Sequence, residues 1–249
     1  MSEERTYRSR IGQVAKKPAC EQVFGVIGAG NWGHRFKLTR HSLDEIALLE
    51  EQLGVHFPVD YKQLLLETGS GAGPYYGLFA PGKILSEIEE WNGIRLDEEG
   101  VLSSPSQPFP FRQSDANEIC SRQKIGPSEN LGRATFLSDG CIPICFQGCT
   151  FFSVLVTAGE QIGRVWSVNS DGWPKAEWRP GTRPPGLLGG LLPDGSHARV
   201  GQADRGFLPR PLPQVDMPPT IRQWYESWLE RVETDLEDYR DYQARAEGQ

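Results

Sequence analysis

The chain has 249 residues, a formal net charge of −7 and a mean hydropathy of −0.47. This length accommodates one large domain or two small ones, each with a sizeable core. The excess of acidic residues disfavours nucleic acid or an anionic membrane surface as the main partner.

The N-terminal residues MSEERTYRSR contain no apolar run, which predicts that no signal peptide is present. Residues 1–22 are polar and basic at their start, and we expect them to form a loose arm. The longest apolar run, residues 151–156, is too short to cross a bilayer. Five cysteines in no pattern typical of secreted scaffolds favour free thiols in a reducing compartment. The sequence therefore predicts a cytoplasmic protein.

Residues 23–33, VFGVIGAGNWG, have the glycine spacing of a dinucleotide-binding fingerprint. That site needs a helix directly after the third glycine, whereas the following residues alternate like a strand. The acids at the expected distance, Glu50 and Glu51, fall inside a predicted helix and not at a strand end. We therefore predict no nucleotide site, and we expect Phe36 and Leu38 to lie in extended chain.

Two helices are predicted after this segment. Ser42 and Glu45 form a capping box that starts the first helix, and Gly54 suits its end. The second helix follows Pro58 and ends at Gly69, because apolar residues recur at helical spacing between them.

The middle of the chain favours β structure. Residues 149–157 and 163–168 are rich in strand-forming residues and are separated by a stretch that suits a hairpin loop. Before them, only a turn or two of helix is predicted, near residues 84–91. Residues 174–219 are rich in proline and glycine and are predicted to form a surface excursion. Residues 241–249 are predicted to be a tail.

The strongest helix signal lies near the C-terminus, where Thr220 and Gln223 form another capping box. A continuous apolar stripe at helical spacing follows, made of Ile221, Trp224, Tyr225, Trp228, Leu229, Val232, Leu236 and Tyr239. Acidic residues predominate on the polar side of the same helix, and such a charged side is typical of a solvated face.

Three cysteines, Cys141, Cys145 and Cys149, are four residues apart, which is neither zinc-finger nor ferredoxin spacing. We interpret them as buried thiols near a sheet core, with a metal or redox role as the alternative. A Cys–His nucleophile pair that meets only in space stays open. No nucleophile elbow or phosphate-binding loop is present. The sequence predicts no catalytic, metal or cofactor site and no small-molecule substrate.

Residues 71–77 place two tyrosines among glycines in a tight turn. Such a turn either packs as a corner or presents aromatic surface, and tyrosine gives large contact area at low entropic cost. The candidate partner-binding residues are this pair and several acidic side chains: Tyr75, Tyr76, Asp139, Glu226, Glu230 and Glu233.

The run FPVDYKQLLLETGSGAGPYYGLF, residues 57–79, resembles the SUKH superfamily, which includes a yeast cell-wall assembly regulator and many bacterial immunity proteins. The helix end at residues 50–54 also fits this family. Further similar segments lie at residues 24–38, 142–166 and 224–229. Residues 174–214 are not covered by the resemblance.

The resemblance implies one α+β domain over residues 23–240, in which helices pack against a bent, mainly antiparallel sheet. It also implies a non-enzymatic protein whose partner is another protein. Bacterial relatives typically neutralise a toxin, often a nuclease, and nucleases must be basic to hold phosphate. We therefore expect an immunity protein that binds a basic toxin domain. The alternative is a regulatory scaffold of signalling or cell-envelope assembly, and both are fold-level analogies.

Overall fold

The computed structural model describes residues 6–17, 34–99, 104–113, 139–148, 151–169, 174–175, 189–191, 197–199 and 218–247. Its helices in this part of the chain are α1 (Tyr7–Ala15), α3 (Leu43–Leu53), α4 (Val59–Glu67), α5 (Pro81–Glu99) and α7 (Ile221–Glu247). The strands are β1 (Leu38–Thr39), β2 (Ser70–Gly71), β3 (Cys141–Gly148), β4 (Phe151–Val156), β5 (Val165–Asn169), β6 (Pro174–Lys175), β7 (Gly189–Leu191) and β8 (His197–Arg199).

The main sheet is antiparallel, with β3, β4, β5 and β6 in sequence order, while β1 pairs with β2 and β7 with β8. Leu78 joins the β1–β2 pair to the main sheet, since it bridges Gly71 on one side and Cys145 on the other. The Phe79 N–H donates to the carbonyl of Ile144 at 2.8 Å. The glycine-rich turn therefore continues one bent antiparallel sheet, as the family resemblance implies.

The predicted hairpin in the middle of the chain is confirmed as β4 and β5. Leu155 lies opposite Val165 in the antiparallel register. The neighbouring strand β3 is irregular, with register shifts after Pro143 and before Gly148. Proline cannot donate to a strand ladder and glycine weakens it, so these two residues mark where β3 bends.

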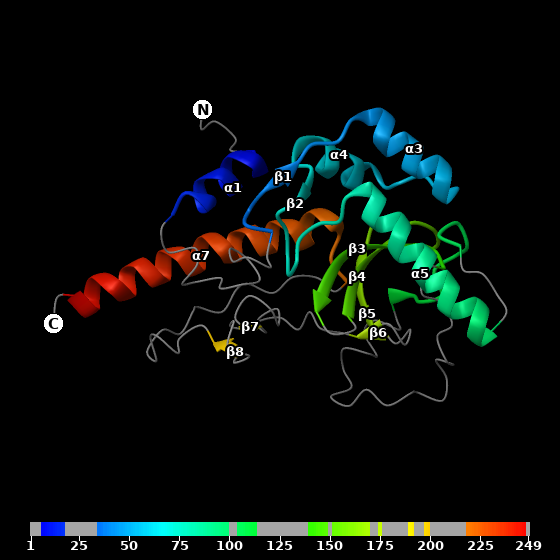
Figure 1. Ribbon diagram of the computed structural model, residues 1–249. Coiled ribbons are helices and arrows are strands. Elements are labelled where there is room, and N and C mark those ends of the chain that lie inside the picture. The colour runs from blue at the N-terminus through cyan, green and yellow to red at the C-terminus, as the bar shows by residue number, and fades with distance from the viewer. Residues whose placement is uncertain are drawn as a thin grey trace.

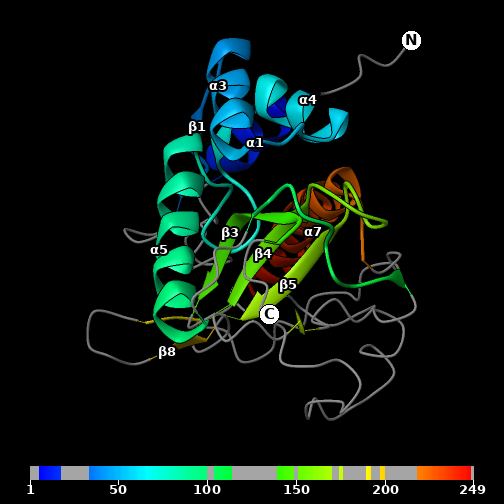
Figure 2. The same ribbon diagram turned by 90° about the vertical axis from the view of Figure 1, so that its right-hand side faces the viewer.

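Helices cover the main sheet from two sides, and Figure 2 shows β3, β4 and β5 between α5 and α7. Consecutive residues Val154, Leu155 and Val156 are all fully buried, so both faces of β4 are covered. On the α5 side, Trp91 packs edge-on against Phe152, with ring centroids 5.1 Å apart.

The helix α5 is longer than the turn or two predicted near residues 84–91. Ile84, Ile88 and Trp91 lie at i, i+4 and i+7 and are buried. Pro81 and two glycines weaken the helix signal in the sequence, and burial of this apolar stripe against the sheet stabilises the helix.

The capping boxes predicted from the sequence are confirmed. Ser42 and Glu45 exchange both bonds at the start of α3, and Gly54 ends that helix with a φ of 64°. At the start of α7, the Thr220 N–H donates to the Gln223 side chain at 2.9 Å and the reciprocal bond measures 3.2 Å. These local signals are strong because they satisfy backbone groups that a helix end leaves unpaired.

The prediction of a loose arm over residues 1–22 is wrong for the helix α1. The Thr6 side chain caps this helix by accepting from the Ser9 N–H at 3.3 Å. Ile11 and Val14 are buried in the core. Figure 1 shows α1 beside α7, so the N-terminal segment is part of the packed structure.

Two further expectations need correction. Leu38 lies in a strand as expected, but Phe36 has a φ of 55° and lies in a turn, because its ring packs into the core there. The helix α7 runs to Glu247, through most of the predicted tail at residues 241–249. The glycine fingerprint, within residues 18–33, lies outside the described residues, as does most of the excursion 174–219 apart from β6, β7, β8 and residues 218–219.

None of the described helices combines the length and apolarity that a bilayer crossing requires. The predicted positions of Glu50 and Glu51 inside a helix are confirmed, since both belong to α3.

The glycine-rich turn generates a stability prediction. Gly77 has a φ of 95°, and a Cβ atom there would collide with the carbonyl oxygen of Gly71. Gly77→Ala should lower the free energy of unfolding by at least about 2 kcal/mol, measured by urea denaturation. A Cβ atom added to Gly93 in α5 would have no neighbour within 4 Å, so Gly93→Ala should instead raise it by about 0.5–1 kcal/mol. Equal effects of the two substitutions would contradict the described turn.

Candidate functional site

The helix α7 carries an aromatic face on which several other segments converge. Trp224, Tyr225 and Trp228 are fully buried or nearly so, and the last two rings lie 5.2 Å apart. The Tyr225 hydroxyl donates to the carbonyl oxygen of Ala72 at 2.7 Å. This bond fixes the glycine-rich turn to α7 and satisfies a polar group that would otherwise be buried alone.

The turn before β1 packs on the same aromatic face. His34 lies edge-on to Trp228 at 5.9 Å, and Phe36 stacks on Trp228 at 6.3 Å. The Phe36 N–H donates to His34 Nδ1 at 3.0 Å. Burial lowers the pKa of His34 to about 4, so this ring is neutral at pH 7 and accepts at Nδ1.

The segment that resembles the SUKH superfamily is held by polar contacts of its own. Glu50 accepts from the Phe57 N–H at 2.5 Å and pairs with Lys62 at 3.2 Å, which fixes the link between α3 and α4. Asp60 in α4 accepts from Arg222 in α7 at 2.9 Å. These residues therefore have structural roles that join α3, α4 and α7.

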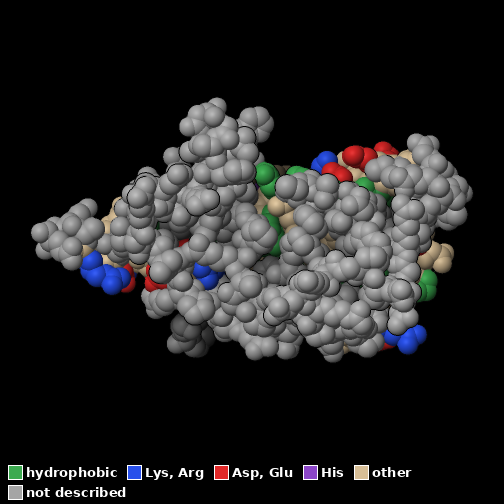
Figure 3. All heavy atoms as spheres, turned by 90° about the horizontal axis from the view of Figure 1, so that it is seen from below, with side chains coloured by type: hydrophobic (Ala, Val, Ile, Leu, Met, Phe, Trp, Pro, Cys, Tyr) green, Lys and Arg blue, Asp and Glu red, His purple; other side chains and the backbone are tan. Residues whose placement is uncertain are grey.

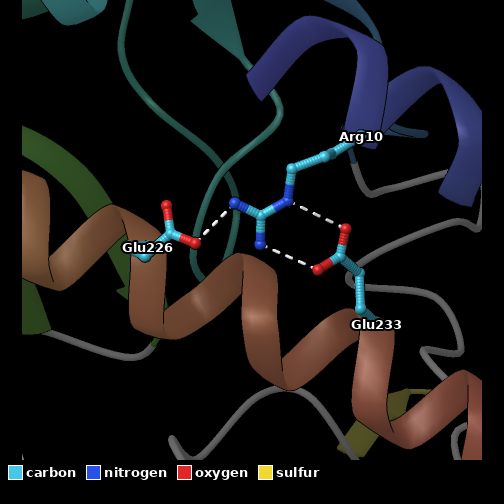
Figure 4. Close-up of polar contacts among 3 residues, drawn as sticks. All are labelled: Arg10, Glu226 and Glu233. Atoms are coloured by element: carbon cyan, nitrogen blue, oxygen red, sulfur yellow. Dashed lines mark hydrogen bonds and ion pairs between the residues drawn. The ribbon is translucent and has the colours of Figure 1, made fainter. Parts of the chain in front are cut away.

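Three glutamates form one stripe on the outer side of α7: Glu226, Glu230 and Glu233 lie at i, i+4 and i+7. We call these three residues the acidic stripe. Arg10 of α1 lies across it, as Figure 4 shows. Its Nε and Nη2 donate to the two carboxylate oxygens of Glu233 at 2.9 and 2.8 Å, and its Nη1 donates to Glu226 at 2.5 Å.

Arg10 hydrogen-bonds to two of the three carboxylates of the stripe and acts on the third, Glu230, only through its charge. Hydrogen bonding to Glu233, followed by that to Glu226, raises the pKa of Arg10. Partial burial, with Glu226 and Glu233 nearby, raises the pKa of Glu230. Burial and the Glu226 carboxylate raise the pKa of Tyr7 to about 12. The stripe therefore keeps an excess of negative charge when Arg10 is bound.

The face of α1 that meets α7 is amphipathic. Tyr7, Arg10, Ile11 and Val14 lie at i, i+3, i+4 and i+7, which places them on one side of the helix. The Tyr7 ring packs edge-on against Tyr225 at 5.3 Å. This helix was not predicted from the sequence, although the apolar spacing and the Thr6 cap are both helix signals.

The structure brings together only part of the predicted partner surface. The three glutamates share one helix face, whereas Tyr75, Tyr76 and Asp139 come from other segments. Tyr75 is 3% exposed, so its ring packs in the core. The expectation that Tyr75 belongs to a contact surface is therefore wrong. Tyr76 is 37% exposed, and Asp139 accepts from the Ser104 N–H at 2.9 Å, which joins the loop at residue 104 to the segment before β3.

Charge is mixed elsewhere on α7. Figure 3 shows basic and acidic side chains together at the end of the molecule where α7 ends. There Arg240 and Asp241 form an exposed ion pair at 3.4 Å. The one-sign character of the acidic stripe is therefore a local property of the middle of the helix.

A serine, a histidine and a glutamate also lie in line, an arrangement that sequence spacing does not reveal. The Ser70 Oγ is 2.8 Å from His41 Nε2, and His41 Nδ1 is 4.0 Å from Glu45. A nucleophile relay needs hydrogen bonds at both steps, and 4.0 Å is too long for one. Ser70 is buried, and Glu45 is held by Ser42, so we interpret the three as a link between β2 and α3.

Among the described residues, no cluster of histidine, cysteine and acidic side chains is arranged to hold a metal ion. The predicted burial of Cys141 and Cys145 is confirmed, and burial raises the pKa of both thiols. The Cys145 thiol donates to the Pro74 carbonyl at 3.0 Å. Cys149 lies outside the described residues.

The fold is α+β, and the candidate site is a helix face with three glutamates, two of which bind Arg10. The chain belongs to the SMI1 / KNR4 family (SUKH-1), whose family model matches residues 41–180. No curated protein and no solved structure matches the chain.

The family is associated with toxin immunity or cell-wall regulation, and its members are generally non-enzymatic. The matched range contains α3, α4, the glycine-rich turn and the main sheet. It contains neither α1 nor α7, so the acidic stripe and the helix that covers it lie outside the matched part of the chain.

The environment of His34 predicts a pH dependence of stability. The unfolded chain holds a histidine of ordinary pKa, 6.5, whereas the folded value is about 4. Between these values the unfolded state binds more protons, so the free energy of unfolding should fall as the pH drops from 6.5 to 4. Urea denaturation at several pH values between 4 and 6.5 measures this change in the free energy of unfolding. His34→Gln should flatten the dependence, and identical slopes in both proteins would contradict it.

Arg10 binds Glu226 and Glu233 of α7, and we call these contacts the arginine clamp. The clamp predicts that Arg10 controls the docking of α1 on α7. Arg10→Ala should lower the free energy of unfolding by about 1–2 kcal/mol, because hydrogen bonds between charged groups are lost at a partly exposed site. Amide hydrogen exchange of residues 7–15 should accelerate by more than that of α3. Arg8→Ala, which removes the same charge from the same helix, is the matched control. Unchanged exchange of residues 7–15 in Arg10→Ala would show that the clamp does not hold α1.

Proposed function

We propose that this protein is a cytoplasmic immunity protein that binds a polymorphic toxin domain and neutralises it by protein–protein contact. Membership of the SMI1 / KNR4 family carries the proposal, since this family is linked to protein–protein interactions with toxins. The proposal assigns no chemical step to the chain, in agreement with a generally non-enzymatic family.

The charge of the chain supports a basic partner. The net charge is −7, and the acidic stripe holds three carboxylates, of which Arg10 binds two. A nuclease toxin carries basic residues because it must hold a phosphate backbone. Surfaces of opposite sign accelerate association and suppress wrong partners. We therefore propose a nuclease-type toxin as the partner, contacted through the acidic stripe, with Tyr76 and Asp139 as further proposed contacts.

The direct test is co-expression with a candidate toxin domain, sought in the reading frames adjacent to the one that encodes this chain. Cells that produce both proteins should grow, and cells that produce the toxin alone should stop growing. The purified pair should co-elute as a complex in gel filtration. Growth arrest that this protein does not relieve, with both proteins produced at normal levels, would refute the proposal.

Charge reversal provides the matched control for the contact surface. Glu230→Lys changes the exposed member of the stripe and leaves in place Glu226 and Glu233, the two that hold Arg10 in Figure 4. It should slow association with the toxin several-fold at low salt, whereas Glu89→Lys on the exposed side of α5 should not. A pull-down that returns several envelope or signalling proteins and no toxin would favour the scaffold alternative.

A further inference from the structure

The helix α1 shows which chemistry the outer face of α7 accepts. Arg10 spans Glu226 and Glu233, and Tyr7 packs edge-on against Tyr225, while Ile11 and Val14 of the same helix are buried. The face therefore combines carboxylates with an apolar contact. Its complement is an amphipathic helix with an arginine at its centre and aliphatic residues one and four positions later.

The helix α1 is short and depends on α7. It has nine residues, fewer than the ~12–15 at which isolated helices become marginally stable in water. Its helical form therefore requires its contacts with the rest of the chain. The helix takes no part in any strand pairing and lies outside the α3–α4 pair, so its loss from α7 breaks no strand ladder among the described residues.

The ion pairs that hold α1 are open to solvent at one side. The side chains of Glu226 and Glu233 are 32% and 33% exposed, and that of Arg10 is 16% exposed. Pairs with this exposure are screened by salt and are weaker than fully buried pairs. The exposed Glu230 adds a third carboxylate beside them. A second arginine can therefore approach the stripe while Arg10 is still bound.

We propose that α1 is an intramolecular competitor for the outer face of α7, and that a partner displaces it with an arginine-bearing amphipathic helix of the same pattern. The displacing helix must supply aliphatic residues, because removal of Ile11 and Val14 exposes the apolar surface they cover. That the partner is a toxin rests on the proposed function, whereas the competition on α7 does not.

A peptide of the α1 segment tests this competition. A fluorescein-labelled synthetic peptide of residues 6–17, TYRSRIGQVAKK, is titrated into the full-length protein and followed by fluorescence anisotropy. It should bind the Arg10→Ala protein at least about tenfold more tightly than the wild type, because the internal competitor has lost its charge-assisted hydrogen bonds. A peptide in which glutamine replaces the arginine at position 10 should bind the Arg10→Ala protein about tenfold more weakly than the unchanged peptide does.

Controls on the protein side identify the site. Glu226→Gln with Glu233→Gln, added to the Arg10→Ala protein, should remove the preference for the arginine peptide. Arg10→Lys keeps the charge without the two-pronged geometry and should give an intermediate affinity, which keeps the test valid if Arg10→Ala fails to fold. Equal peptide affinity for wild type and variants, or binding that ignores the two glutamates, would overturn the proposal. A concentration-dependent dimer in light scattering would assign the face to α1 of a second copy and would also overturn it.

The outcomes separate this inference from the proposed function. If the peptide exchanges as expected but the protein does not protect cells from the toxin, the proposed function fails and the competition on α7 stands. If the protein protects cells but the peptide shows no preference for the Arg10→Ala protein, the competition fails and the proposed function stands.

Discussion

The burial of the aromatic face of α7 is the constraint on which the rest of the structure depends. Trp224, Tyr225 and Trp228 are large side chains, and each buries apolar area that stabilises the fold by about 1.5–3 kcal/mol or more. They can be buried only if several distant segments meet at α7. The turn at His34, the glycine-rich turn at Ala72 and the helix α1 all do so. A single helix near the end of the chain thus gathers three segments from its first third.

Sequence reasoning succeeded where the determining interactions are local. The capping pairs Ser42–Glu45 and Thr220–Gln223 act over three residues, and the hairpin of β4 and β5 needs only a short loop. It failed where tertiary packing overrides local preference. Phe36 takes a left-handed backbone because its ring stacks on Trp228, and no pattern in its neighbours encodes that.

The candidate site shows the same division. The spacing of Glu226, Glu230 and Glu233 alone is sufficient to place them on one helix face. Their partner was missed, since Arg10 lies 216 residues from Glu226 and 223 from Glu233 in sequence. Tyr75 was expected in a contact surface, yet its place in a tight turn could not reveal which of two adjacent tyrosines points inward.

The separation between Arg10 and Glu233 also sets an order of events during synthesis. A ribosome adds about 5–20 residues per second, so the acidic stripe emerges roughly 10–45 s after α1. Through that interval residues 7–15 are made but have no α7 to bind, so they lack the contacts on which their helical form depends. Closing a loop of more than 200 residues also costs chain entropy that local contacts do not. The arginine clamp can therefore form only once α7 is synthesised, after every strand of the main sheet has emerged.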